Sequence, residues 1–497
     1  MKKIRTFLLF LLCSQIYFSQ VDSVAIKKDS IPKIVKTWDY INVQDTIKYP
    51  FLKKTEETIK TLLNDPVLKK AHWGFCLYNP KTNEVLVNKG IKERYLPAST
   101  TKILSAESAL HYLGANYRWK TQVLYTGEID SLGVLQGDLH VVYNGDPTIG
   151  LDAINAKGYS EIVNEVFFAL KQKGIKSVKG NIIAESVVFK KDAKFYNVNK
   201  YFLNFGDYYS VIPSKDGKLV AVKEIKKTIS ATEKEDLESI NEELDPEEQI
   251  INDIIADLEN SIRAFKFDNI ELKNSMLPNP PSFLANKIKE GISRKGIKIF
   301  GKLQTQDYKN MQITNKRKLL FNYDSPTLDD LAFFTVQRSN NTYADHLLRA
   351  TGYLIGKEDT QINSIRTVEN YLKETDFDFD GFVLADGSGL SRSNWITPIS
   401  QVKFLTYVLK QPYFNTFYKW LPSAGESGTL RGSFLNSPLK GNIHAKTGTL
   451  NAVKTLAGYV DLPNGERLTF SLMINSYSGG VAAVKSRMEK LLETVLY

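Results

Sequence analysis

The spacing of apolar residues predicts strands and helices near the N-terminal end of the chain. The segments HWGFCLYN and EVLVNKG flank the turn PKTN, which predicts a β-hairpin within residues 65–90. The next stretch, YLPASTTKILSAESALHYLG, begins like a loop and continues with apolar residues at helical spacing. We therefore expect a helix that carries Ser99 and Lys102 near its start and ends around Gly114.

The same patterns predict a mixed structure at the C-terminal end. The segment TLDDLAFFTVQRSNNTYADHLLRATGYLIG predicts two helices with a break at 339–341. GNIHAKTGTL and KTLAGYVDLPNGERLTFSLMIN predict strands, with a hairpin turn at 463–465, and residues 481–497 predict a final helix. A unit built from both ends of the chain therefore encloses a large middle part.

Short β-like runs dominate this middle part, residues 117–321. Examples are LQGDLHVVYNGD and VKGNIIAESVVF, with helix-like pieces such as YSEIVNEVFFALKQKG between them. Nine of the twenty residues 231–250 are Glu or Asp. This composition favours an exposed helix or a mobile insert. A calcium site is the alternative, although the spacing matches no EF-hand loop.

The first residues, MKKIRTFLLFLLCSQIYFSQ, predict a secretory signal. A basic start precedes an apolar run, 4–12, that is too short for a stable membrane anchor, and we expect cleavage near Ser19. Cys13 raises a lipid anchor as an alternative, but leucines precede it where lipoprotein processing needs a small residue. We expect an exported protein of the periplasm or cell envelope, with at most peripheral membrane association.

The composition is typical of a globular protein with two or three domains. The chain has 497 residues, of which 42% are hydrophobic and 24% charged. The formal net charge of +10 allows attraction to an anionic envelope polymer and does not indicate nucleic-acid binding. Cys13 lies in the predicted signal, and Cys76 lies in an apolar run, where a buried strand residue is favoured over a nucleophile.

Ser99 and Lys102 are the first candidates for chemistry. Positions i and i+3 of a helix share a face, so we expect the Lys102 amine within reach of the Ser99 hydroxyl. A serine needs a base to act as a nucleophile, and a lysine serves when burial or a second cation lowers its pKa. Alone, the S-x-x-K spacing is a weak signal, because Ser99 also suits the role of a helix N-cap.

Two further motifs follow in the order that such chemistry needs. The segment SNN holds Ser339 and Asn341 at the predicted helix break, and KTG begins at Lys446 on a predicted strand. Ser339 could shuttle a proton to a leaving group, and Asn341 could hold an amide. Lys446 and Thr447 could bind a substrate carboxylate, while Gly448 would let a substrate backbone lie close to the strand.

S-x-x-K, S-x-N and K-T-G in this order are the signature of penicillin-binding proteins and serine β-lactamases. Further stretches resemble the class C low-molecular-mass penicillin-binding proteins, the D-alanyl-D-alanine carboxypeptidase/endopeptidase family. They are GDPTIG, SPTLDDLAFFTVQRSNNTYAD, DGSGLSR, AGESGTLRG and HAKTGTLNAVKTLAGYV, spread over most of the chain outside the signal and the acidic insert. The 240 residues that separate Ser99 from Ser339 also resemble this family's plan, in which extra domains follow the nucleophile helix.

The resemblance implies a penicillin-sensitive serine DD-peptidase that uses no cofactor or metal. Ser99 would attack the D-Ala-D-Ala carbonyl, Lys102 would take its proton, and Ser339 would pass a proton to the leaving amine. Asn341 would hold the substrate amide, and water would release the acyl-enzyme. The other implied substrate-binding groups are Lys446, Thr447 and Gly448 at the terminal carboxylate, the N–H groups of Ser99 and Thr449 as an oxyanion hole, and Asp146 and Arg392 at the stem peptide.

Asp146 and Arg392 have a plainer alternative, which is an aspartate that caps a turn and an arginine on a surface loop. The five histidines are scattered and form no H-E-x-x-H motif, so metal catalysis is disfavoured.

The implied fold is α+β, a serine β-lactamase/transpeptidase-like domain with an antiparallel sheet flanked by helices plus a helical subdomain. We expect a signal at 1–19 and a discontinuous catalytic domain at 20–120 and 320–497. The inserted β-rich part, 121–319, would include the acidic insert 225–260.

The expected partners are peptidoglycan stem peptides, with β-lactam antibiotics as covalent inhibitors. The rival functions are a serine β-lactamase, for which no deacylating group can be assigned, and an inactive binder of peptidoglycan fragments. The sequence leaves open the choice between carboxypeptidase and endopeptidase activity, and the oligomeric state.

Overall fold

The computed structural model describes residues 40–41, 45–149, 154–186, 210–213, 219–222, 280–307, 317–357 and 360–496. Residues 41–497 form one unit. The predicted signal, 1–19, and the acidic insert, 225–260, lie outside the described residues. Within the described part of the chain, no helix is both long and apolar enough to cross a membrane.

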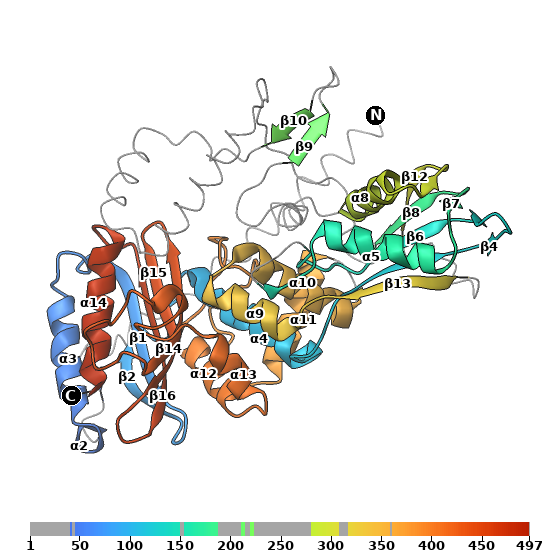
Figure 1. Cartoon of the computed structure of the whole chain (residues 1–497). Coiled ribbons are helices and arrows are strands. Elements are labelled where there is room, and N and C mark those ends of the chain that lie inside the picture. The colour runs from blue at the N-terminus through green and yellow to red at the C-terminus, as the bar shows by residue number, and fades with distance from the viewer. Residues whose placement is uncertain are drawn as a thin grey trace, which may run out of the picture. The chain divides into compact units, whose positions relative to one another are not determined.

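A five-stranded antiparallel sheet joins the two ends of the chain (Figure 1). Its strand order is β14-β15-β16-β1-β2, so that Trp73 of β1 lies opposite Ile474 of β16. The turn between β15 and β16 forms where Gly465 adopts a φ of 80°, which glycine reaches without a steric penalty. The strands are β1 His72–Asn79, β2 Glu84–Lys89, β14 Ile443–Leu450, β15 Val453–Asp461 and β16 Arg467–Asn475.

Helices cover both faces of this sheet (Figure 1). On one side α12, Pro398–Leu409, packs against β1 and β16. On the other side α14, Val481–Glu493, packs against β15 and against α3, Phe51–Leu62. The buried residues of α14 recur at helical spacing, so this helix turns an apolar stripe inward; they are Val484, Met488, Leu491 and Leu492. The short helices α2, Asp45–Lys48, and η6, Thr494–Leu496, lie beside α3.

A cluster of helices encloses α4, the helix that follows Ser99. All nine residues from Lys102 to Leu110 are buried, because α4 contacts α9, α10 and α11. Gly114, with a φ of 79°, ends α4, as expected of a glycine after the last turn. The cluster is built from α4 Lys102–Leu113, α9 Leu328–Gln337, α10 Asn341–Gly356, α11 Gln361–Lys373 and α13 Phe414–Trp420.

The middle of the chain forms two further sheets, with strand orders β12-β8-β6-β3-β13 and β11-β7-β5-β4. The helices α5 and α8 pack on each other and on the larger sheet. Glu185 is buried there and accepts hydrogen bonds from His140 at 2.7 Å and Arg317 at 2.8 Å. The elements are β3 Lys120–Tyr125, β4 Glu128–Ile129, β5 Val134–Gln136, β6 Leu139–Tyr143, α5 Tyr159–Gln172, β7 Ser177–Val178, β8 Ile182–Ser186, α8 Pro280–Arg294, β11 Lys298–Ile299, β12 Leu303–Asp307 and β13 Lys318–Asp324, with a separate hairpin of β9 Ser210–Pro213 and β10 Leu219–Val222.

The predicted α+β class is confirmed, and so are the break between α9 and α10 and the hairpin of β1 and β2. Cys76 is a free, buried residue of β1, as expected. The start of the nucleophile helix differs from the prediction. Ser99 lies in a separate 3₁₀ turn, η1 Ala98–Thr101, and the α-helix begins only at Lys102. Such turns are common at the N-termini of α-helices.

Candidate active site

Ser99 lies in a turn whose backbone is fixed by its neighbours. It is the second residue of η1, and Ala98 before it has a φ of 47°, in the left-handed region. The hydroxyls of Thr100 and Thr101 donate to the carbonyls of Pro97 and Ala98 at 2.8 and 2.9 Å. Since the first N–H groups of a helix have no acceptor within it, the Ser99 N–H is a candidate donor to a bound group.

The amine of Lys102 reaches three oxygen atoms in the interior. Its Nζ lies 2.8 Å from Ser99 Oγ, 2.7 Å from Asn341 Oδ1 and 2.7 Å from the Ser388 carbonyl oxygen. The Lys102 side chain is fully buried, so these three contacts replace water. They fix the amine beside the hydroxyl of Ser99.

Burial lowers the pKa of Lys102 to about 7, although the charges of Asp345 and Asp386 act in the opposite direction. A large share of the Lys102 side chains is therefore neutral near pH 7. A neutral amine keeps two N–H groups for the Asn341 and Ser388 oxygens and turns its lone pair to the Ser99 hydroxyl. The geometry and the pKa together suit a general base.

The loop 385–394 carries the Ser388 carbonyl to the lysine amine. Asp386 accepts hydrogen bonds from two N–H groups of this loop, at 2.7 and 2.8 Å, and from a side-chain amide at 2.9 Å. From α10, Asp345 accepts a bond from the Gly387 N–H at 2.8 Å. Burial raises the pKa of Asp345 to about 7, and the neighbouring charge of Asp386 acts in the same direction. Two carboxyl groups thus hold the loop in place.

Each residue of the SNN segment has a distinct position at the break between α9 and α10. Ser339 adopts a φ of 55°, which turns the chain. Asn340 caps α10, since its side-chain oxygen accepts a bond from the Tyr343 N–H at 3.0 Å. Asn341 is the first residue of α10 and accepts the hydrogen bond from Lys102. The local sequence of a helix N-terminus therefore places two polar side chains in the site.

Lys446 of β14 lies beside Ser339. Its Nζ donates to Ser339 Oγ and to the Thr447 carbonyl oxygen, both at 2.8 Å. The Lys446 side chain is fully buried. Burial holds the pKa of Lys446 well below its ordinary value, and the charges of Lys102 and Lys454 lower it further. An anion bound nearby would favour the ammonium form of Lys446.

The strand β14 is an edge strand whose outer backbone groups can pair with an extended ligand. Within its sheet β14 is bonded to β15 alone. At its outer edge, the Ala445 N–H donates to the Pro422 carbonyl at 3.0 Å. Backbone groups alternate in direction along a strand, so the N–H groups of Thr447 and Thr449 face the same outer edge. This edge is a ready template for adding a peptide strand.

Gly448 is the point at which β14 touches the turn of Ser99. A Cβ atom at Gly448 would lie 2.9 Å from the Ser99 nitrogen and 2.8 Å from the Pro97 carbonyl oxygen. The Thr455 hydroxyl of β15 donates to the same carbonyl at 2.7 Å. Glycine at this position therefore lets the turn of Ser99 lie directly against β14.

Two threonine hydroxyls lie on one face of β14. Thr447 donates to the Thr429 hydroxyl of η5, Gly428–Leu430, at 2.7 Å. Thr449 is exposed, and its hydroxyl accepts a hydrogen bond from Lys454 at 2.7 Å. Because Thr447 and Thr449 are two positions apart on a strand, their side chains point to the same side.

Asp146 and Arg392, the two candidates for contact with the stem peptide, lie in different environments. Asp146 is buried, accepts bonds from the Thr148 N–H and hydroxyl at 2.8 and 2.6 Å, and has its pKa raised to about 7 by burial. Among the residues that the structure describes, neither of these bonds involves another candidate residue. Arg392 is exposed, and its guanidinium donates to the Asn451 carbonyl at 3.3 and 3.4 Å, next to the end of β14. Of this pair, Arg392 lies at the strand that carries Lys446.

Sequence reasoning missed the groups that hold the lysine. Asp345, Asp386 and the Ser388 carbonyl all act on Lys102, and none was a candidate. One signal was available, because DGSGLSR is dense in turn-forming residues and begins with an aspartate that can accept from its own loop.

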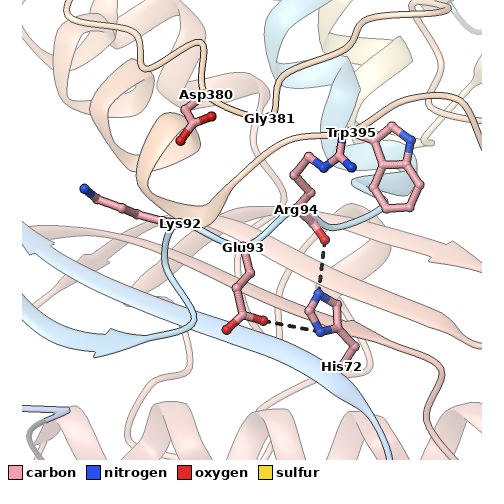
Figure 2. Close-up of a pocket in the computed structure, with 7 residues that line it drawn as sticks. All are labelled: His72, Lys92, Glu93, Arg94, Asp380, Gly381 and Trp395. Carbon is pink, nitrogen blue, oxygen red and sulfur yellow. Dashed lines mark hydrogen bonds and ion pairs between the residues drawn. The ribbon is translucent and has the colours of Figure 1, made fainter. Parts of the chain in front are cut away.

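A separate pocket of about 660 Å³ lies where the loop after β2 meets residues 380–381. Figure 2 shows His72 bonded to Glu93 and to the Arg94 carbonyl, with the Arg94 guanidinium beside the Trp395 ring. None of the candidate residues lines this pocket. Its lining residues are His72, Lys92, Glu93, Arg94, Asp380, Gly381 and Trp395.

A family model and two relatives identify the family of the chain, and a solved structure shows the same fold. Residues 55–200 and 272–495 match the D-Ala-D-Ala carboxypeptidase 3 (S13) family. The chain is 27% identical to a D-alanyl-D-alanine carboxypeptidase of Actinomadura sp., covering 86% of this chain and 82% of the relative. It is 26% identical to the D-alanyl-D-alanine carboxypeptidase DacB of Haemophilus influenzae, covering 84% and 88%. The crystal structure of penicillin binding protein 4 (dacB) from Haemophilus influenzae has a TM-score of 0.61 at 21% identity, covering 89% of this chain and 97% of that one, and shows the same fold.

Proposed function

The chain belongs to the D-Ala-D-Ala carboxypeptidase 3 (S13) family, and we propose that it is a serine DD-peptidase that cleaves D-alanyl-D-alanine peptides of the cell wall through an acyl-enzyme on Ser99. The observation that carries this assignment to particular residues is the contact of the buried Lys102 amine with Ser99 Oγ, at 2.8 Å. A nucleophile beside a base of lowered pKa is the arrangement that acyl transfer needs. The relatives' activity and the residues of the site point to the same reaction.

In the acylation step, Lys102 takes the proton of the Ser99 hydroxyl while Ser99 Oγ bonds to the peptide carbonyl carbon. The N–H groups of Ser99 and Thr449 stabilise the oxyanion that forms. The C–N bond then breaks, and Ser339 passes a proton to the leaving nitrogen. The ammonium of Lys446, which the substrate carboxylate favours, replaces that proton through its 2.8 Å contact with Ser339.

In the deacylation step, water adds to the ester carbonyl and the acid leaves. Lys102 returns its proton to Ser99, and the proton that water loses protonates Lys446 again. The enzyme thus ends each turnover in its starting protonation state.

The substrate would lie along the outer edge of β14. Its terminal carboxylate would bind the hydroxyls of Thr447 and Thr449 near Lys446, and Asn341 would hold the amide on the acyl side. The close approach at Gly448 supports this position, because it brings the turn of Ser99 against β14.

Arg392 and Asp146 are the residues proposed to contact the stem peptide. Arg392 suits an anionic group of the acyl side chain, since it is exposed at the end of β14. Asp146 would need to exchange its contacts with Thr148 to reach a substrate. An ammonium group of the stem peptide is its chemically suited partner.

β-Lactams would react with the same serine, because they present a strained amide beside a carboxylate. One crystal structure of the Haemophilus influenzae protein, with a TM-score of 0.59, is of a complex with a β-lactam. We propose that benzylpenicillin forms an ester on Ser99 that hydrolyses slowly. We also propose that the protein is exported to the periplasm or cell envelope. Residues 121–319 would form an inserted domain, and the enzyme would also act on cross-links as an endopeptidase.

Intact mass spectrometry with benzylpenicillin, followed by peptide mapping, tests this function. We expect a lasting adduct on Ser99, none in Ser99→Ala, and release of D-alanine from an acyl-D-Ala-D-Ala peptide. Rapid loss of penicillin without an adduct would instead indicate a β-lactamase. No adduct and no turnover would indicate an inactive binder.

A further inference from the structure

Lys454 lies beside the two threonines, on the strand next to them. The register of β14 and β15 places Lys454 directly opposite Thr449. Its Nζ donates to the Thr449 hydroxyl at 2.7 Å. Paired residues of adjacent strands point to the same face, so the Lys454 ammonium shares a face with the hydroxyls of Thr447 and Thr449. Gly448 and its opposite residue Thr455 face the Ser99 turn instead.

Lys446 and Lys454 differ in their access to solvent, and this decides which of them an incoming ligand meets first. Lys446 is fully buried, and its pKa is held well below the ordinary value by burial and by the charges of Lys102 and Lys454. Lys454 is only half-buried. The charge of Lys454 is one of those that lower the pKa of Lys446, and its Nζ is bonded to the Thr449 hydroxyl. Lys454 therefore brings a cation to the accessible side of the threonine pair.

We infer that Lys454 is a specificity-determining residue, which attracts the terminal carboxylate of the peptide to the hydroxyls of Thr447 and Thr449. This inference rests on the proposed function. It adds that the terminal carboxylate is the first group of the substrate that the enzyme recognises. Binding of the carboxylate then favours the ammonium form of Lys446, which completes the site. A peptide that ends in a neutral amide gains nothing from Lys454.

The expected effect comes from the attraction between the Lys454 ammonium and the peptide carboxylate, which a threonine hydroxyl bridges. Two hydrogen bonds in sequence put the Lys454 ammonium about 5 to 6 Å from the carboxylate. At that distance, near a protein surface, the attraction corresponds to about a tenfold gain in affinity, within a range of about 3- to 100-fold. Salt should weaken the gain, because the Debye length falls from about 10 Å at 0.1 M to about 3 Å at 1 M.

The test compares Lys454→Met with the wild-type enzyme on two peptides, acyl-D-Ala-D-Ala and the same peptide with a C-terminal carboxamide. We expect kcat/KM for the carboxylate peptide to fall about tenfold, mainly through KM, and the value for the carboxamide to stay unchanged. The fall should shrink in 1 M NaCl, and Lys454→Arg should restore most of it. The control is Lys410→Met, at an exposed lysine after α12, which should match the wild-type enzyme on both peptides.

Equal losses on both peptides would overturn the inference, because they would mean that Lys454 merely supports β14. No loss on either peptide would overturn it as well. If the wild-type enzyme forms the Ser99 adduct but cleaves neither peptide, the acylation rates of benzylpenicillin and its methyl ester replace them in the same comparison. No adduct and no cleavage in the wild-type enzyme would refute the proposed function itself, and the role of Lys454 with it.

Discussion

Titration of Lys102 should control the rate at which Ser99 is acylated. The amine is fully buried, and burial lowers its pKa from 10.5 to about 7. Only the neutral amine can take the Ser99 proton. Acylation by benzylpenicillin should therefore increase as the pH rises through about 7 and become constant above it.

The size of the effect follows from the two pKa values. With a pKa of about 7, roughly half of the Lys102 side chains are neutral at pH 7 and about 1% at pH 5. A lysine with the ordinary value of 10.5 would be neutral in only about 0.03% of molecules at pH 7. Burial thus increases the fraction of competent base at pH 7 by about three orders of magnitude. It does so at an electrostatic cost on the order of 5 kcal/mol to the folded state.

Quenched-flow mass spectrometry of the Ser99 adduct between pH 5 and pH 9.5 measures this dependence. The second-order rate constant should fall about tenfold for each pH unit below 7. Circular dichroism at each pH controls for unfolding, and Ser99→Ala controls for reaction elsewhere. A rate constant that does not change between pH 5 and pH 9, or one with its midpoint near pH 10, would refute Lys102 as the base.

Three further changes have defined outcomes. Asp345→Asn keeps an acceptor for the Gly387 N–H but removes a charge that favours the Lys102 ammonium. The midpoint of the pH profile of acylation should therefore move to lower pH, and an unchanged midpoint would contradict this. Gly448→Ala places a methyl group 2.9 Å from the Ser99 nitrogen and should slow acylation at least 100-fold with a stability loss of about 1–3 kcal/mol, measured by adduct kinetics and thermal unfolding; wild-type kinetics would disprove the close packing. Glu185→Gln removes the buried charge and replaces one of the two oxygens that His140 and Arg317 contact with a donor NH2 group, so it should lower stability by about 3 kcal/mol in denaturant titrations at pH 7, while acylation at 25 °C stays unchanged. These two bonds hold the pKa of Glu185 below its ordinary 4.5 despite burial, so its stabilisation should be present above that pH and lost as the pH falls through the folded value; a variant as stable as wild type at pH 7 would count against the cluster.

The sequence was sufficient for the parts of the site that short motifs encode. Ser99 and Lys102 are three residues apart, and the helix start that brings them together is a local structure. Ser339 and Asn341 likewise take their positions from one helix break, which the turn-forming SNN segment predicts. Gly448 is expected to let a substrate backbone lie close to the strand, and the structure shows a close approach there by the turn of Ser99.

The missing parts depend on contacts between distant segments. The Ser388 carbonyl meets Lys102 across 286 residues, and a backbone carbonyl leaves no trace in residue identity. The importance of Asp345 follows from its burial beside Asp386, which the helical pattern of α10 does not indicate. The 3₁₀ start at Ser99 was also missed, because apolar spacing fixes the face of a helix and not the form of its first turn.

The pairing of β1 with β16 determines how far synthesis of the chain must proceed before the site can form. Strand β14 must join β15 and β16, and these must join β1, before Gly448 reaches the turn of Ser99 and Lys446 reaches Ser339. The ribosome completes β1 at Asn79 and β16 only at Asn475. Until then the nascent chain carries Ser99 without the strand against which its turn packs. The arrangement around Ser99 can therefore form only after synthesis has passed Asn475.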